Sequence, residues 1–132
     1  MASAGVVGVV LPTVTLSLRT FAFSQYAVLR DAGVSLALST DCNPGTSWCE
    51  SMPYVVQLAC LVYGMPVPDA LWAATRGGAA ALRRDDVGRV DVGHPGDLAV
   101  LDVEQEGMLG PRDEAGGGGE PLDCCGRGVA GP

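Results

Sequence analysis

Two stretches of apolar residues near the start of the chain predict buried strands. Residues 6–11 are apolar or glycine, and residues 34–40 are mostly apolar with small hydroxyl side chains. Apolar side chains at consecutive positions are typical of strands buried on both faces, as in a parallel sheet. Residues 24–31, which lie between the two stretches, predict a short helix that ends near Gly33. This order of elements predicts a right-handed, parallel βαβ unit and therefore an α/β fold.

Polar loops are expected directly after each of the two strands. Residues 12–23 predict a long loop after the first strand, and residues 41–47 are rich in turn-forming types after the second. The next apolar stretch predicts a helix over residues 52–63. Ser51 is the expected cap at its start and Gly64 the expected end.

The second half of the chain predicts a broken helix and then two short strands. A helix with proline in its first turn is expected over residues 68–75. We expect the glycines at 77 and 78 to break this helix before residues 79–84 continue as further helical turns. Residues 88–92 and 97–102 predict two short strands around a Gly-His-Pro-Gly turn.

These elements divide the chain of 132 residues into three parts. Residues 1–84 carry the strands and helices, and residues 85–103 carry the two short strands. Residues 104–132 are rich in glycine and acidic residues and poor in large apolar ones. Such a segment buries too little apolar surface to offset the entropy lost on ordering, so a disordered tail is expected.

Composition makes two classes of partner unlikely from the outset. The formal net charge is −7, and all eight basic residues are arginines that form no run. Nucleic acids and anionic membranes both attract clustered basic residues, so neither is expected as a partner. The five cysteines are odd in number and show no Cys-x-x-Cys spacing, which is typical of a reducing compartment. A cytoplasmic location is therefore expected.

The loop 41–47 is the expected position of any chemistry. Ligands of parallel sheets gather at the carboxyl ends of the strands, in the loops that follow them. Asp41 comes directly after the second strand, where a carboxylate could bind a metal ion or transfer a proton. The same Asp, followed by Asn, Pro and Gly, is also what an ordinary turn contains, and the pattern alone leaves both interpretations open.

The sequence Ser39-Thr40-Asp41-Cys42-Asn43-Pro44-Gly45-Thr46-Ser47 resembles the signature loop after the last barrel strand of the imidazolonepropionase family. These proteins are metal-dependent amidohydrolases of histidine degradation. Residues 4–12 are similar to the preceding barrel strand of that family. Residues 70–75, 87–89 and 96–102 are similar to the segment in which amidohydrolases leave the barrel and return to a small β-sandwich. The resemblance covers about residues 3–102, and residues 104–132 depart from the family's pattern, so they are expected to be either disordered or an off-family tail.

The resemblance implies a fold, a reaction and a set of site residues. The fold is the C-terminal portion of a (β/α)8 barrel plus returning strands of a small β-sandwich. The reaction is hydrolysis of 4-imidazolone-5-propanoate to N-formimidoyl-L-glutamate. Asp41 matches the carboxylate metal ligand that also handles the proton of the bound water. Asn43 and Gly45 match residues that contact the product, and Thr46 matches one that contacts the substrate.

The sequence also departs from this family in its histidines. The family's zinc or iron site needs several histidines, and this chain has one, His94, in a predicted surface turn. A complete barrel takes about 250 residues. We therefore expect an incomplete barrel that is inactive alone. Its expected partners are a small-molecule substrate and either the missing N-terminal part of the barrel or further copies of the chain. The alternatives are a non-catalytic truncated fragment, a complementing subunit or another amidohydrolase.

Overall fold

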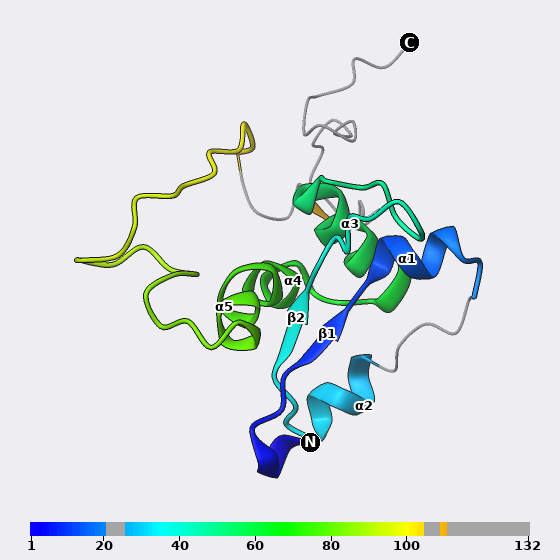
Figure 1. Ribbon diagram of the computed structural model, residues 1–132, viewed down its shortest axis with the longest axis horizontal. Coiled ribbons are helices and arrows are strands. Elements are labelled where there is room, and N and C mark those ends of the chain that lie inside the picture. The colour runs from blue at the N-terminus through cyan, green and yellow to red at the C-terminus, as the bar shows by residue number, and fades with distance from the viewer. Residues whose placement is uncertain (21–25, 105–108, 111–132) are drawn as a thin grey trace.

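The computed structural model describes residues 1–20, 26–104 and 109–110. Within these residues the sheet consists of two strands, β1 (Gly8–Val10) and β2 (Leu36–Leu38). They pair in parallel, with Gly8 opposite Leu36 and Val10 opposite Leu38. Helix α2 (Tyr26–Asp31) lies between them in sequence, so the predicted order of strand, helix and parallel strand is confirmed (Figure 1).

The two strands differ in burial, which corrects one expectation. All three residues of β2 are buried, as predicted. In β1, however, Val9 is 50% exposed. Helices cover β2, because η2 (Ala73–Gly77) and α5 (Gly78–Ala81) both pack on it. The described residues leave one face of β1 without such a layer, so the prediction of burial on both faces holds only for β2.

The loop expected after the first strand contains a helix. Helix α1 (Pro12–Ser17) starts directly after β1, with proline at its first position, and packs against α3 (Met52–Tyr63). Proline at the first helical position costs no hydrogen bond, because that N–H has no partner within the helix anyway. A 3-10 turn, η1 (Ala2–Ala4), precedes β1. Residues 21–25, where the rest of the predicted loop and the start of the next predicted helix fall, lie outside the described part.

Helix α3 begins and ends at the predicted residues. The Ser51 hydroxyl accepts a hydrogen bond from the backbone N–H of Tyr54 at 3.4 Å, and this satisfies one free donor of the first turn. The helix ends at Gly64, whose φ of 64° is the left-handed conformation that closes many helices. Val55 and Ala59 are fully buried on its inner face and belong to the core.

The expected break at the glycine pair is wrong. Helix α4 (Val67–Trp72) runs without interruption into the π-helical turn η2 and then into α5. Both glycines have helical dihedral angles, with φ of −61° at Gly77 and −59° at Gly78. A Cβ atom at Gly77 would overlap the carbonyl oxygen of Leu36 in β2. Gly77 therefore brings the helix into direct contact with the strand, and this contact explains a glycine within a helix.

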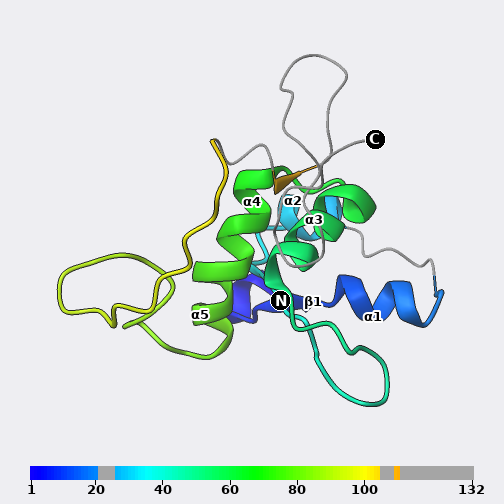
Figure 2. The same ribbon diagram turned by 90° about the horizontal axis from the view of Figure 1, so that it is seen from above.

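Residues 82–104 form turns and extended chain, and neither predicted short strand is present there. Val92 and Val100 are 98% and 93% exposed. A strand needs a neighbour to accept its backbone hydrogen bonds, and the described part of the chain offers none beside this segment. Figure 2 shows one part of the segment looping away from the helices and another part running back beside α4. The division into three parts stays a prediction, because residues 105–108 and 111–132 lie outside the described part. Leu109, which is described, is buried in the core.

Candidate active site

The loop that follows β2 lies beside the first turn of α1 (Figures 1 and 2). Both strands point their carboxyl ends toward this region, because they are parallel. Within the loop, Asn43 and Ser47 form a short antiparallel bridge, in which the Asn43 N–H donates to the Ser47 carbonyl at 2.6 Å. Ser47 is 3% exposed, so the base of the loop is anchored in the protein.

The side chain of Asn43 connects the other predicted site residues. Its Oδ1 accepts hydrogen bonds from the N–H groups of Gly45, at 2.8 Å, and Thr46, at 2.9 Å. Its Nδ2 donates to a carboxylate oxygen of Asp41 and to the Thr46 hydroxyl, both at 3.0 Å. The structure therefore brings Asp41, Asn43, Gly45 and Thr46 together in one hydrogen-bonded loop. The hydrogen bonds from the Gly45 and Thr46 N–H groups to Asn43 form an Asx turn, and Asp41 adds a carboxylate to it.

Asp41 stands in an unusual backbone conformation. Its φ is 48°, in the left-handed region, which costs most L-residues about 1–2 kcal/mol. Asparagine and aspartate adopt this region more readily than other residues, because their short polar side chains bond locally. The Asp41 side chain is exposed, and its Oδ2 lies 3.5 Å from the Thr46 hydroxyl. An oriented and solvent-accessible carboxylate can accept a proton or bind a cation.

Sequence reasoning missed Thr13, which contacts this loop from the other strand end. Thr13 lies in the first turn of α1 and is 3% exposed. Its hydroxyl donates to the backbone carbonyl of Thr40 at 2.9 Å, across 27 positions of sequence. A second hydroxyl contact, between Tyr63 and Thr15 at 2.9 Å, ties the same helix to α3. No local pattern marks such a residue, because its partner is distant in sequence.

The described residues do not assemble a complete metal site. Among them no group of three or more His, Cys, Asp or Glu side chains is close enough to hold a metal ion. Asp41 offers one carboxylate, and zinc sites use three or more protein ligands. His94 lies in the turn predicted for it, and its Nε2 is 3.1 Å from the backbone carbonyl of Asp85.

Cys42 in the loop and Cys60 in α3 show no arrangement for nucleophilic chemistry. Cys42 is exposed beside Asp41, and Cys60 is buried in α3. Burial raises the pKa of the Cys60 thiol, which disfavours the reactive thiolate. These two residues fit the structural interpretation better than a catalytic one.

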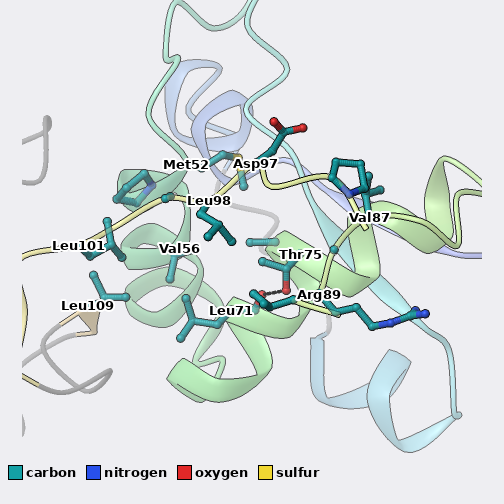
Figure 3. Close-up of a pocket in the computed structure, with 16 residues that line it drawn as sticks. Met52, Val56, Leu71, Thr75, Val87, Arg89, Asp97, Leu98, Leu101 and Leu109 are labelled. Atoms are coloured by element: carbon teal, nitrogen blue, oxygen red, sulfur yellow. Dashed lines mark hydrogen bonds between the residues drawn. The ribbon is translucent and has the colours of Figure 1, made fainter. Parts of the chain in front are cut away.

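A pocket of about 390 Å³ lies elsewhere, between α3, the helix α4–η2 and residues 87–101. None of residues 41–47 lines it. Its wall is mainly apolar, and the Thr75 hydroxyl there donates to the Leu71 carbonyl at 2.7 Å (Figure 3). The lining residues labelled in Figure 3 are Met52, Val56, Leu71, Thr75, Val87, Arg89, Asp97, Leu98, Leu101 and Leu109. Reactive groups do not converge on this pocket, so the loop remains the candidate site.

The amidohydrolase family model matches residues 3–118, which include both strands, α1 and the whole loop. The chain belongs to the amidohydrolase family. This amidohydrolase chain is 47% identical to the imidazolonepropionase of Streptomyces avermitilis over 103 residues, which are 78% of the chain and 25% of that relative. It is 46% identical to the imidazolonepropionase of Mycolicibacterium smegmatis over 103 residues, covering 78% and 26%. With the imidazolonepropionase of Syntrophobacter fumaroxidans the identity is 43% over 113 residues, covering 83% and 26%.

These similarities confirm the resemblance inferred from the loop at residues 39–47. The chain spans about a quarter of the length of the curated relatives it matches. Amidohydrolases are hydrolases, and the mixed helix and strand content of this chain agrees with an α/β fold. In the described residues, no helix has the length and apolar character needed to cross a membrane.

Proposed function

We propose that this chain forms part of an imidazolonepropionase, which opens 4-imidazolone-5-propanoate with water to give N-formimidoyl-L-glutamate. The observation that carries the proposal is the loop after β2. It displays an exposed carboxylate, Asp41, held by the Asn43 amide at 3.0 Å, within the segment that matches the amidohydrolase family. The identity of 46–47% with curated imidazolonepropionases supports this reaction over others of the family.

In this proposal Asp41 is the general base. Its carboxylate takes a proton from the attacking water and returns it to the ring nitrogen that leaves when the C–N bond breaks. The hydrogen bonds from Asn43 and Thr46 keep one carboxylate oxygen oriented, which leaves the other oxygen for the water. Thr46 contacts the substrate, and Asn43 and Gly45 contact the product.

Amidohydrolases generally bind a metal ion, and we propose zinc or iron for this one. The described residues do not form such a site alone, because Asp41 is a single carboxylate and they contain no group of three or more ligands. Asp41 is one ligand in this proposal, and histidines on other barrel strands are the remaining ones. The proposed whole is a (β/α)8 barrel in the cytoplasm that acts on a small molecule.

A chimera tests this function. The matching segment of the Streptomyces avermitilis enzyme is replaced by the full chain, and turnover of 4-imidazolone-5-propanoate is measured. We expect hydrolysis, and we expect Asp41→Asn to lower kcat/KM by about 10²–10⁴-fold, the usual contribution of a general base. Asp102→Asn, at an exposed acid outside the loop, is the control and should leave kcat/KM unchanged. A folded chimera without turnover, or full activity after Asp41→Asn, would refute the proposal.

A second candidate is a non-catalytic portion that complements the rest of a barrel. The absence of a three-ligand group among the described residues favours it for the chain by itself. Mixing the separate chain with the remaining part of the Streptomyces enzyme distinguishes the two ideas. Complementation predicts that turnover appears on mixing and survives Asp41→Asn, whereas the first proposal predicts that this substitution lowers turnover by about 10²–10⁴-fold.

A further inference from the structure

The peptide bond that joins Thr40 to Asp41 is held at both of its polar ends. On one side its carbonyl oxygen accepts the hydrogen bond from the buried Thr13 hydroxyl at 2.9 Å. On the other side its N–H donates to the hydroxyl of Ser39 at 3.2 Å. A peptide bond is planar, so fixing the carbonyl and the N–H fixes the plane from which Asp41 projects.

A second set of contacts fixes Asp41 beyond this plane. The Asn43 amide donates to the Asp41 backbone carbonyl at 2.5 Å and to its carboxylate at 3.0 Å. The φ of 48° is the rotation about the N–Cα bond of Asp41, between the fixed peptide plane and the Asp41 carbonyl held by Asn43. The direction of the carboxylate therefore depends on Thr13, which holds the preceding peptide bond, and on Asn43, which bonds the Asp41 carbonyl and carboxylate directly. Thr13 is the more informative of the two, because it lies in helix α1, which follows the other strand.

We propose that Thr13 is a positioning residue, which acts on Asp41 through the Thr40 carbonyl and links the two strand ends at the active site. The proposal rests on the function proposed above only where activity is concerned, because the placement of the loop can be measured directly. Thr13 touches no substrate in this proposal. Its effect on the reaction is to hold the base at the correct angle.

The chain offers a conservative variant and a matched control. Thr13→Ser keeps the hydroxyl, whereas Thr13→Val replaces it with a methyl group of similar size and removes the donor to Thr40. Tyr63→Phe removes a hydroxyl from the 2.9 Å contact with Thr15 in the same helix, and that contact does not touch residues 39–47. Any effect of Thr13→Val that is shared by Tyr63→Phe reflects a loosened α1 rather than a displaced Asp41.

The first measurement uses the full chain and amide hydrogen exchange by NMR. In Thr13→Val, we expect hydrogen exchange of the backbone N–H groups of Asn43 and Thr46 to accelerate about tenfold, because the loop opens more often. Thr13→Ser should restore the protection, and Tyr63→Phe should leave these two amides as they are. Unchanged exchange in Thr13→Val, or equal acceleration in Tyr63→Phe, overturns the proposal whatever the reaction is.

The second measurement uses the active chimera. Thr13→Val should lower kcat about 10–100-fold with KM within about twofold, since a small misplacement of a reacting group costs that much. Thr13→Ser should recover most of kcat. A rise in KM at constant kcat would instead make Thr13 a binding residue and overturn positioning. If the chimera shows no turnover at all, the proposed function fails, and the exchange measurement still decides the role of Thr13.

Discussion

At the scale of single residues, the conformation of Asp41 separates what this position does for folding from what it does for chemistry. A left-handed φ favours glycine, tolerates asparagine and penalises alanine. In the function proposed above, the negative charge of the carboxylate is needed for the reaction, whereas its hydrogen bonds to Asn43 and Thr46 need only an oxygen acceptor. Variants of Asp41 should therefore rank differently in stability than in activity.

We predict that Asp41→Ala lowers the free energy of unfolding by about 1–2 kcal/mol, because a Cβ without a local hydrogen bond is strained in this conformation. Asp41→Asn should stay close to the wild type, because asparagine adopts this conformation and still accepts the bond from Asn43. Asp41→Gly should be at least as stable as Asp41→Asn. Urea unfolding followed by circular dichroism measures all three. Equal stability of the alanine and glycine variants would show that the conformation carries no strain.

At the scale of elements, the contact between η2 and β2 determines how the helices sit on the sheet. Gly77 faces the Leu36 carbonyl with no room for a side chain, whereas a Cβ at the neighbouring Gly78 would meet nothing within 4 Å. Two adjacent glycines in one helix thus differ in surroundings and share helical dihedral angles. They form a matched pair for testing the contact.

We predict that Gly77→Ala lowers the free energy of unfolding by about 1–3 kcal/mol, because the added methyl group forces the helix away from β2. Gly78→Ala should raise it by about 0.5–1 kcal/mol, because alanine loses less entropy in a helix than glycine does. Thermal or urea unfolding measures both. Equal effects of the two substitutions would contradict the close approach at Gly77.

A buried phenol links two other elements and makes stability depend on alkaline pH. The Tyr26 hydroxyl in α2 donates to the Asp69 carboxylate in α4. Burial, and next the Asp69 bond, raise the pKa of Tyr26, while Arg30, 5.4 Å from the ring centre, opposes the shift. A raised pKa in the folded state favours the neutral phenol. Its contribution is complete below the unfolded pKa and is lost as pH rises through the folded one.

We therefore predict that wild-type stability falls as the pH rises above about 10, where unfolded tyrosine ionises. Tyr26→Phe should lower stability at neutral pH by about 1 kcal/mol, through the lost hydrogen bond, and should weaken the alkaline decline. Tyr54→Phe is the control for removing one phenol and should keep the decline. An equal pH slope in wild type and Tyr26→Phe would show that Tyr26 does not titrate differently on folding.

The same elements show what the sequence could predict and what it could not. The bounds of α3 follow from Ser51 and Gly64, which act on their own helix, and both were predictable. The Gly77 contact depends on β2 some forty positions earlier, so the glycine was mistaken for a break. Residues 88–92 and 97–102 predicted two short strands around a turn, but strands form only beside a partner strand. The family resemblance follows from the motif at residues 39–47, and the role of this loop as the site stays a prediction, whereas the Thr13 contact required the three-dimensional arrangement.

At the scale of the whole molecule, the two-stranded sheet leaves apolar surface in contact with water. Val9 on β1 is 50% exposed and Val6, before it, is 46% exposed. In both views α5 and α1 lie on opposite sides of β1 (Figures 1 and 2). Open strand edges with apolar neighbours are a common route to association between chains.

We predict that the chain self-associates in a concentration-dependent way, and that Val9→Lys weakens this association at least about tenfold, or ~1.4 kcal/mol. A lysine on an exposed strand opposes pairing with another chain. Leu82→Lys is the control, because Leu82 is 73% exposed but lies at the end of α5 and outside the sheet. Sedimentation velocity across a concentration series measures the effect. A monomer at all concentrations would contradict the prediction.

The π-helical turn at Ala73–Gly77 has a consequence for how this segment tolerates changes in length. A π turn holds one more residue than the α turn it replaces, so it behaves as a one-residue insertion stored inside a helix. Removing one residue within the turn would therefore restore a regular α-helix and leave the residues beyond it in phase, whereas removing one residue from α4 would rotate everything beyond it by about 100°. After a deletion in α4, Gly77 would turn away from Leu36 and lose its close contact with β2. The helix should therefore tolerate the loss of one residue within Ala73–Gly77 more readily than in α4.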